Sequence, residues 1–436
     1  MSRIFFLLCA IWCASLLYGQ EVIHSLPYYI EAAQTNSPLI QDCLNQKEIQ
    51  KQELMRLKAL YTRSILELNG DYLFVPIISK SKGKTTFEWN AKDDTDYYGY
   101  DLGESSGHLQ AGITWTQPLL GSSSYKVAKE RTGIEMNIMD NNIHLEKHQL
   151  ERTVTEQYIL CLLDKKQIEL ADSIGNILTQ QENIVRKLVE SGLAKQSDLH
   201  LLQIEQNANR DQRTTSCQSY RTHLIDLNIL CGIKDTTCVS LENINLSPRF
   251  INSPGSGFLK QYQLDSLNTI MSLRSFNLQY KPQLNLFVDG GLRTGEYTAI
   301  QRHFGMSAGV TLSWILFDGK QKRMKERQTR AQLNSIETYK TNFQLQQELR
   351  KQQYLTELKT YEERNILLLK RLSEYTRILS DYKKEMQAGQ LSVIDYILIL
   401  RDKIQAEQDR MLLQTNRQLL TAAFNYWNWE INYWEI

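Results

Sequence analysis

Two histidines stand at a spacing that could support metal chemistry. His144 and His148 are four residues apart, which places both on one face of a helix. Glu146 lies between them, but not at the position that the HExxH motif of zinc enzymes requires. No third ligand is evident in the sequence, so we interpret the pair as part of a solvated helix face.

No other set of side chains predicts catalysis. No glycine-rich phosphate loop, nucleophile elbow or pair of acid–base carboxylates stands out. The 50 Lys and Arg residues almost balance the 49 Asp and Glu residues, whereas binding to nucleic acid needs a basic excess. The sequence therefore predicts a protein that is not an enzyme, uses no metal or other cofactor, and does not bind nucleic acid.

The N-terminus predicts export. A positive residue precedes the apolar stretch 4–17, and a small residue stands just before Gln20, so residues 1–19 are predicted to be a signal peptide. Beyond it, no window has the roughly 20 apolar residues that a membrane helix needs. Cys231 and Cys238 either pair in an oxidising compartment or remain two unpaired small residues. The mature protein can therefore enter a membrane only through strands.

Two kinds of element account for most of the chain. Period-two alternation of apolar and polar residues predicts four strands, around residues 66–75, 109–116, 283–293 and 306–316. Apolar residues three and four apart follow each strand pair and predict coiled-coil packing. The stretch from Lys320 to Ala388 contains neither Pro nor Gly and would span about 100 Å as one helix.

The elements occur twice along the chain. Three patterns recur about 200 residues later, which is typical of an internal repeat. These are Asn36–Pro38 with 252–254, Ile113-Thr114 with Val310-Thr311, and Gly192 and Asp198 with Gly389 and Asp395. A single insertion, the polar stretch 79–107, reconciles their spacings, and we predict that it forms the longer extracellular loop.

The repeat predicts the domain organisation. Each repeat contains a helix, a strand pair and a long antiparallel helical hairpin that reverses at Gly192 or Gly389. The predicted parts are a signal peptide at 1–19, a first repeat at 20–231, an irregular connection at 232–257 and a second repeat at 258–436. The fold class is therefore mainly α with a membrane β part.

Four strands are too few to close a barrel in a membrane. Closed single-chain barrels begin at about eight strands, and open strand edges are not tolerated in lipid. Several chains must therefore share one barrel. We predict a homotrimer, in which three chains form a 12-stranded β-barrel that continues as an α-helical barrel.

Several of these segments resemble TolC-like outer-membrane efflux proteins. Tyr280–Leu284 resembles the strand entry of that family, Leu316–Lys320 its strand-to-helix exit, and Asn36–Pro38 its early helix signal. The paired segments beginning at Gly192 and Gly389 resemble its two periplasmic tips. The resemblance implies a passive export duct that extends from the outer-membrane lipid into the periplasm. It also implies a periplasmic adaptor and an inner-membrane transporter as partners, in an efflux or type I secretion system.

The resemblance also suggests site residues. Asp198 and Asp395 match the family's periplasmic constriction, although an acid at such a position also caps a helix, and Ser392–Asp395 fits a capping box. A second family aspartate is replaced by Leu398, and a basic residue after the second tip glycine is replaced by Leu391. The tip residues Gly192, Leu193, Gly389 and Gln390 are candidates for adaptor docking.

Two other classes of protein share some of these features. A periplasmic adaptor has a coiled-coil hairpin, but one hairpin rather than two alternating with strand pairs. A structural coiled-coil scaffold explains the heptads but gives the four strands no role. The aromatic residues at 425–429, with Tyr433 and Trp434, follow a helix, so we expect them to pack at its end rather than form an interfacial belt.

Overall fold

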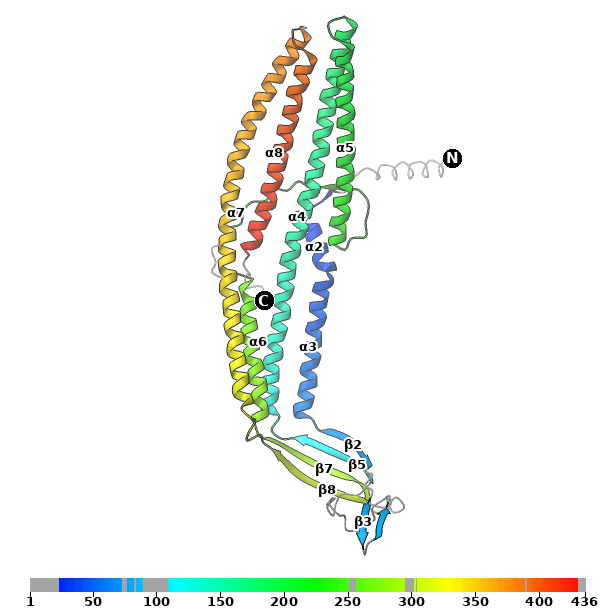
Figure 1. The fold of residues 1–436 in the computed structure, drawn as a ribbon, viewed down its shortest axis with the longest axis vertical. Helices are drawn as coiled ribbons and strands as arrows, with labels where there is room; N and C mark the ends of the chain where they lie inside the picture. The colour runs from blue at the N-terminus through cyan, green and yellow to red at the C-terminus, as the bar shows by residue number, and fades with distance from the viewer. Residues whose placement is uncertain are drawn as a thin grey trace, which may run out of the picture. The chain divides into compact units, whose positions relative to one another are not determined.

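A computed structural model describes residues 23–72, 77–81, 84–88, 109–250, 256–294, 302, 304–388 and 390–429 (Figure 1). The predicted signal peptide and Gly389 lie outside the described residues. The chain forms two compact units. The first comprises Met1–Leu44, Asn141–Lys260 and Tyr339–Ile436, and the second comprises Asn45–Asp140 and Gln261–Thr338. Each unit takes segments from both predicted repeats, and the repeat boundaries stay a prediction.

Long helices dominate the chain. They are α2 (Leu26–Asn36), α3 (Pro38–Thr62), α4 (Ser122–Glu190), α5 (Gln196–Leu230), α6 (Leu259–Asn277), α7 (Gln321–Gln387) and α8 (Val393–Trp427), with a short 3-10 helix η1 (Leu278–Tyr280). Helix α7 contains 67 residues, and α4 contains 69. The long helix predicted from the heptad pattern is therefore confirmed. Within the described residues, no helix is sufficiently long and apolar to cross a membrane.

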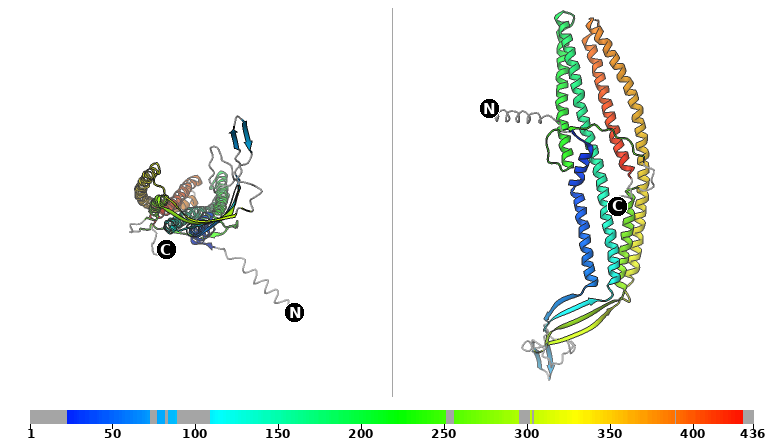
Figure 2. Two further views of the ribbon diagram at one scale, coloured as in Figure 1. Left: turned by 90° about the horizontal axis from the view of Figure 1, so that it is seen from below. Right: turned by 180° about the vertical axis from the view of Figure 1, so that it is seen from behind.

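Two antiparallel hairpins form much of the first unit. Helix α4 lies beside α5, and α7 lies beside α8, in both views of the ribbon (Figures 1 and 2). Apolar side chains from both hairpins form one buried cluster, which includes Leu202 of α5 and Met386 of α7. Truncating such a side chain typically costs ~2–5 kcal/mol, so this cluster holds the two hairpins together.

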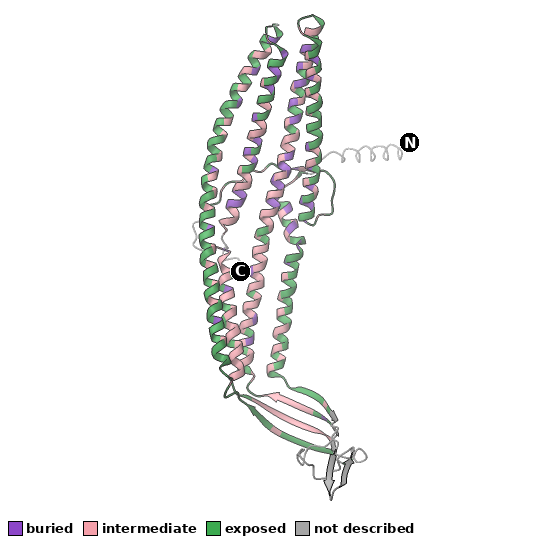
Figure 3. Cartoon of the chain, viewed as in Figure 1, coloured by how far each residue is buried: buried purple, intermediate pink, exposed green. Residues whose placement is uncertain are grey.

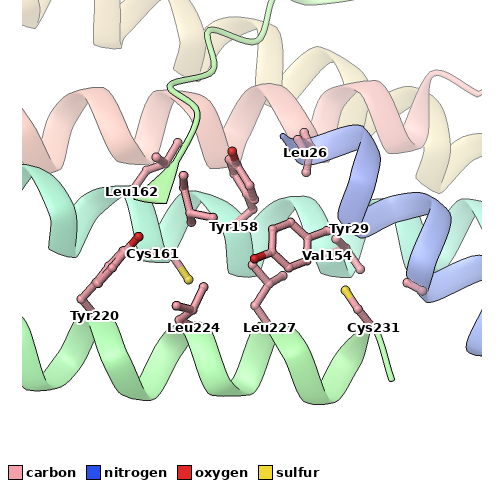
Figure 4. Packing of buried hydrophobic residues seen from close by; sticks show 12 residues of the cluster. Leu26, Tyr29, Val154, Tyr158, Cys161, Leu162, Tyr220, Leu224, Leu227 and Cys231 are labelled. Carbon is pink, nitrogen blue, oxygen red and sulfur yellow. The ribbon is translucent and has the colours of Figure 1, made fainter. Parts of the chain in front are cut away.

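A second cluster joins α2, α4 and α5 to the connection between the predicted repeats (Figure 4). The fully buried Tyr158 lies at its centre, and its hydroxyl is 2.8 Å from the Glu242 carbonyl and 3.0 Å from the His24 carbonyl. Burial raises the pKa of Tyr158 to about 12. The two-residue strands β1 (Ile23–His24) and β6 (Ser240–Leu241) pair in parallel beside it. The connection is thereby attached to the helices along part of its length.

The Asn36–Pro38 pattern marks a break between two helices. Helix α2 ends at Asn36, Ser37 is extended, and Pro38 begins α3. The Asn36 side chain donates a 2.9 Å hydrogen bond to the carbonyl of Cys231 at the end of α5. Gly232 follows with φ of +65°, and a Cβ atom there would lie 2.7 Å from the Cβ of Asn36. Glycine is therefore required by both the backbone conformation and the close approach.

The second unit contains a four-stranded antiparallel sheet. Its strands are β2 (Ile65–Tyr72), β5 (Leu109–Pro118), β7 (Gln283–Thr294) and β8 (Phe304–Ser313), in the order β2-β5-β7-β8. The two predicted strand pairs therefore join through β5 and β7. Strand β8 ends at Ser313, before the predicted end at 316. Glycines allow the close pairing, because a Cβ atom on Gly291 would lie 2.5 Å from the Ala111 carbonyl oxygen.

A short hairpin overlaps the start of the stretch 79–107, which the sequence predicts to be an extracellular loop. Strands β3 (Ile77–Ser81) and β4 (Lys84–Glu88) pair antiparallel. The polar, irregular composition of this stretch gives no clear period-two alternation, which is why sequence reasoning missed the strands.

Candidate functional site: a two-faced sheet and two hairpin turns

One face of the sheet is apolar across all four strands. Leu66 lies opposite Trp115, Trp115 opposite Val288, and Val288 opposite Ala308. Residues that are directly opposite share a face, and every second residue along a strand joins them. This apolar sheet face comprises Leu66, Leu68, Ala111, Ile113, Trp115, Leu284, Leu286, Val288, Leu292, Met306, Ala308, Val310 and Leu312.

The opposite face is mainly polar, and Ile65 and Phe287 are its apolar members. Glu67 lies opposite Thr114, Thr114 opposite Asp289, and Asp289 opposite Ser307. An amide nitrogen on this polar sheet face, Nδ2 of Asn69, donates a 3.2 Å hydrogen bond to Oγ1 of Thr114. The sheet is therefore amphipathic over its whole width.

The apolar sheet face is largely uncovered within one chain. Leu68 is 81% exposed, Met306 73% and Leu312 63%. The edge strands β2 and β8 are the most exposed (Figure 3). Contiguous exposed apolar surface of this kind marks contact with a membrane or with another protein.

The first hairpin turn lies between α4 and α5. Gly192 has φ of +75°, a conformation that glycine adopts without steric cost. The N–H groups of Gly192 and Leu193 donate to the carbonyls of Val189 and Leu188, which satisfies the carbonyls left free where α4 ends. The predicted reversal of the hairpin at Gly192 is confirmed, and Leu193 projects from the turn with 64% of its surface exposed.

The second hairpin turn lies between α7 and α8. The N–H of Gln390 donates a 2.9 Å hydrogen bond to the Glu385 carbonyl, and Ser392 is the N-cap of α8. Its hydroxyl accepts a 3.2 Å hydrogen bond from the Ile394 N–H. Leu391 packs against the buried cluster that joins the hairpins, whereas Leu398 is half exposed.

Asp198 and Asp395 take different roles in capping. Asp198 accepts a 3.2 Å hydrogen bond from the N–H of Lys195, the residue that precedes α5. Asp395 is exposed in the first turn of α8, and its carboxylate makes no hydrogen bond or ion pair to any described residue. Capping is therefore confirmed for Asp198. At the second turn the cap is the Ser392 hydroxyl, which leaves the Asp395 carboxylate available for another role.

Pairs of oppositely charged or hydrogen-bonded side chains link the helices of the two hairpins. Arg401 of α8 forms an ion pair with Glu205 of α5, so the two hairpins are joined by charge as well as by apolar packing. A cavity of about 500 Å³ lies beside this pair, lined by α4, α5 and α8. Within the first hairpin, His223 Nδ1 lies 2.5 Å from the buried Asp164 carboxylate, and burial raises the pKa of Asp164.

The interpretation of the histidine pair as a solvated face is wrong for His148. Its ring stacks on Tyr426 and Trp429, with centroids 4.8 and 4.2 Å away. Its Nε2 donates to the Tyr426 carbonyl at 2.9 Å, and burial lowers the pKa of His148. The aromatic residues at the end of α8 cover this face, and Phe258 joins them. The described residues contain no group of three or more candidate metal ligands.

The same contacts test the prediction that the aromatic residues at 425–429 pack at the end of a helix. The described aromatic residues after Asn425 pack around His148, Phe258 and Phe343, as expected for packing at a helix end. Tyr433 and Trp434 lie outside the described residues. Cys231 and Cys238 are both free thiols, the first buried and the second exposed.

An amphipathic antiparallel sheet combined with two long helical hairpins is the fold of a class of outer-membrane channels. The chain is similar to CusC, a protein that forms a transmembrane channel, with a TM-score of 0.69, 12% identity and coverage of 93% of this chain and 92% of that one. It is also similar to the outer-membrane protein VceC of Vibrio cholerae (TM-score 0.68, 11% identity, 92% and 95% coverage). The corresponding values for the outer-membrane channel CmeC of Campylobacter jejuni are 0.65, 10%, 92% and 85%.

The sequence itself matches no protein-family model and no curated protein. The chain has the fold of these outer-membrane channels over nearly its whole length. The resemblance to TolC-like outer-membrane proteins that the sequence indicates is therefore confirmed for the fold.

Proposed function

We propose that this protein is one protomer of an outer-membrane channel that exports molecules passively. The observation that carries the proposal is the continuous apolar sheet face, on which Leu68 and Met306 are largely exposed in one chain. Such a face is stable when it contacts lipid, and the polar sheet face behind it can then contact water. Neither an adaptor nor a coiled-coil scaffold needs a sheet of this kind.

The free edges of the sheet support a shared barrel. Strand direction alternates from β2 through β5 and β7 to β8, because every pairing is antiparallel. Strand β8 of one copy therefore runs antiparallel to β2 of the next, and a ring of copies closes without a parallel pair. Three copies give twelve strands, an even number within the known range, and no edge remains in lipid.

The helical hairpins extend the duct into the periplasm in this proposal. The strand pair and hairpin form a duplicated repeat, so a trimer contains six hairpins. The channel supplies a water-filled path, and an inner-membrane transporter supplies the energy through a periplasmic adaptor.

The two hairpin turns are the proposed docking site for that adaptor. Gly192, Leu193 and Gln390 lie in these turns, and Gly389, which directly precedes Gln390 in the sequence, is the fourth candidate. The exposed apolar side chain of Leu193 is suited to bury against a partner. Nearby, Asp198 and Asp395 are the proposed constriction, where threefold symmetry gathers like charges and raises the local cation concentration.

A pair of neighbouring substitutions tests the membrane role of the sheet. Val310 belongs to the apolar sheet face and Thr311 to the polar one, and both are exposed in β8. Arginine facing lipid costs ~2–4 kcal/mol near the middle of a bilayer, whereas a lumen position tolerates it. Val310→Arg is expected to remove most of the heat-modifiable trimer from the outer-membrane fraction, and Thr311→Arg to retain it. Equal trimer amounts in the two variants would contradict the proposal.

A second pair tests adaptor docking. Leu193→Glu is expected to abolish efflux without reducing the amount of trimer, because a charge at the turn opposes apolar docking. Ile204→Glu is the control, since Ile204 is exposed to a similar degree (60% against 64%) but lies further along α5. Efflux is measured by accumulation of a fluorescent pump substrate. Wild-type efflux in the Leu193 variant, or equal loss in both variants, rules out docking at this turn.

A further inference from the structure

We propose that the start of helix α7 binds the anionic headgroups of phospholipids in the membrane leaflet that faces the periplasm. This inference rests on the proposed function, because it requires β8 to cross the membrane. It adds a site that recognises lipid through charge, at the junction between the sheet and the helices.

The first observation is an exposed apolar segment directly after β8. Trp314 is 58% exposed, Leu316 80% and Phe317 83%. Nε1 of Trp314 donates a 3.2 Å hydrogen bond to the Tyr280 carbonyl, so the indole is held at the end of the strand pair. Exposed tryptophan and apolar side chains at a strand end favour the boundary between headgroups and acyl chains.

The second observation is the cluster of positive charge that follows. The segment 320–330 contains six basic residues and one acidic residue, Glu326. The basic residues are Lys320, Lys322, Arg323, Lys325, Arg327 and Arg330. All are exposed except Lys325, which is half-buried, and none forms an ion pair with any residue in the described ranges. The ammonium group of Lys322 lies 5.9 Å from the centroid of the Tyr280 ring, and the other cations of this basic segment present their charge to solvent.

Helix stability does not explain these cations. The start of a helix carries a partial positive charge, so basic residues there are unfavourable and acidic ones favourable. The first turn of α7 contains no acid. Asp318, just before the helix, accepts hydrogen bonds of 2.8 Å from the N–H groups of Lys320 and Lys322. It therefore caps the helix without pairing with the basic side chains.

An anionic phospholipid matches both observations, because it combines acyl chains with a phosphate. A free phosphate or a nucleic acid would leave Leu316 and Phe317 without a partner. Helix α7 rises ~1.5 Å per residue, so the cations from Lys320 to Lys325 lie within about one Debye length of the start of the helix. Each cation near an anionic membrane surface strengthens binding by about fivefold.

The experiment measures which lipid the full-length protein retains. Purified protein in mild detergent is mixed with equal amounts of phosphatidylglycerol and phosphatidylcholine that have the same acyl chains. After gel filtration, the bound headgroups are quantified by mass spectrometry. We expect at least tenfold enrichment of phosphatidylglycerol at 50 mM salt, where the Debye length is about 14 Å. At 500 mM salt the Debye length falls to about 4 Å, so most of this enrichment should be lost.

Charge reversal provides the specific test. The triple variant Lys322→Glu, Arg323→Glu, Lys325→Glu is expected to bind both lipids almost equally. The change does not oppose folding of α7, because acids suit a helix start. The control variant Lys359→Glu, Arg364→Glu, Lys370→Glu reverses three exposed charges much further along the same helix and should keep the enrichment.

Three results would overturn the inference: no enrichment in the wild-type protein, equal enrichment in the triple variant, or sedimentation with peptidoglycan in place of lipid selectivity. If the triple variant does not assemble, the wild-type protein still tests the inference, because enrichment of phosphatidylglycerol that does not fall at 500 mM salt would contradict binding through charge. An outer-membrane trimer without lipid selectivity contradicts only this inference. A soluble monomer contradicts the proposed function itself.

Discussion

Asp395 allows the proposed constriction to be tested without damage to the fold. Its carboxylate makes no hydrogen bond or ion pair with any described residue, whereas the Ser392 hydroxyl caps α8. Asp395→Asn loses only a favourable interaction with the start of the helix, ~0.3–1 kcal/mol. Ser392→Ala loses the cap, which typically costs ~1 kcal/mol. The structure therefore separates the charge at this turn from its contribution to stability.

The expected effect on the channel follows from the removal of three carboxylates. At ~4 Å in water, each unit charge attracts a unit cation by ~1 kcal/mol, and a divalent cation more strongly. Asp395→Asn should therefore weaken block by Mg²⁺ at least about tenfold. Relief of that block should raise the single-channel conductance measured in a planar lipid bilayer with Mg²⁺ present. Ser392→Ala should leave both quantities unchanged while lowering the unfolding temperature. The reasoning fails if Asp395→Asn leaves conductance and block unaltered, or if Ser392→Ala changes them equally.

Two substitutions with a matched control, and one pH titration, test how the helices and turns are stabilised. Leu202→Ala should lower the stability of the folded chain by ~2–5 kcal/mol in denaturant unfolding, whereas Ile204→Ala, at an exposed site, should change it by less than ~0.5 kcal/mol. His223→Ala removes the partner of the buried Asp164 carboxylate and should lower the free energy of unfolding by ~1–3 kcal/mol. Burial raises the pKa of Asp164, so this carboxyl takes up a proton as the pH falls, and the destabilisation should become smaller at low pH. Hydrogen bonds from the start of α7, chiefly from the Lys322 N–H, lower the pKa of Asp318. Its contribution to stability should therefore be complete above its unfolded pKa and be lost as the pH falls through the lower folded value. A carboxyl titration of Asp318 by NMR at or above 3.8 would contradict this assignment.

Long regular elements were predictable because one physical pattern fixes each of them. Apolar residues three and four apart, without Pro or Gly, define α7 to within one residue at each end. Alternation likewise identifies β5, β7 and β8, and it sets which residues share a face. The sequence also indicates the break at Asn36–Pro38 and the turn at Gly192, since Pro and Gly impose local backbone conformations.

Features that depend on contacts between distant segments were not predictable. The join between β5 and β7 places Gly112 opposite Gly291, and nothing local in either strand identifies that partner. His148 was assigned to a solvated face because the aromatic residues that cover it lie at the far end of the chain. Lys195 precedes α5, a helix start that the sequence pattern did not specify, because the ends of helices are the least certain part of a sequence-based assignment.

The sidedness of the sheet emerges only from the pairing register. Sequence alternation gives two faces for each strand but does not align one strand with the next. The register places Leu66, Trp115, Val288 and Ala308 in one row, so the four apolar faces coincide. A slip of one residue in any pair would move that strand's apolar residues to the polar side.

Membrane fractionation after mild chemical cross-linking tests most directly whether several chains share one barrel. The full-length protein is expressed in a Gram-negative host, cross-linked in intact cells, and separated into soluble, inner-membrane and outer-membrane fractions. We predict a heat-modifiable trimer in the outer-membrane fraction. A monomer in the soluble fraction would contradict the channel.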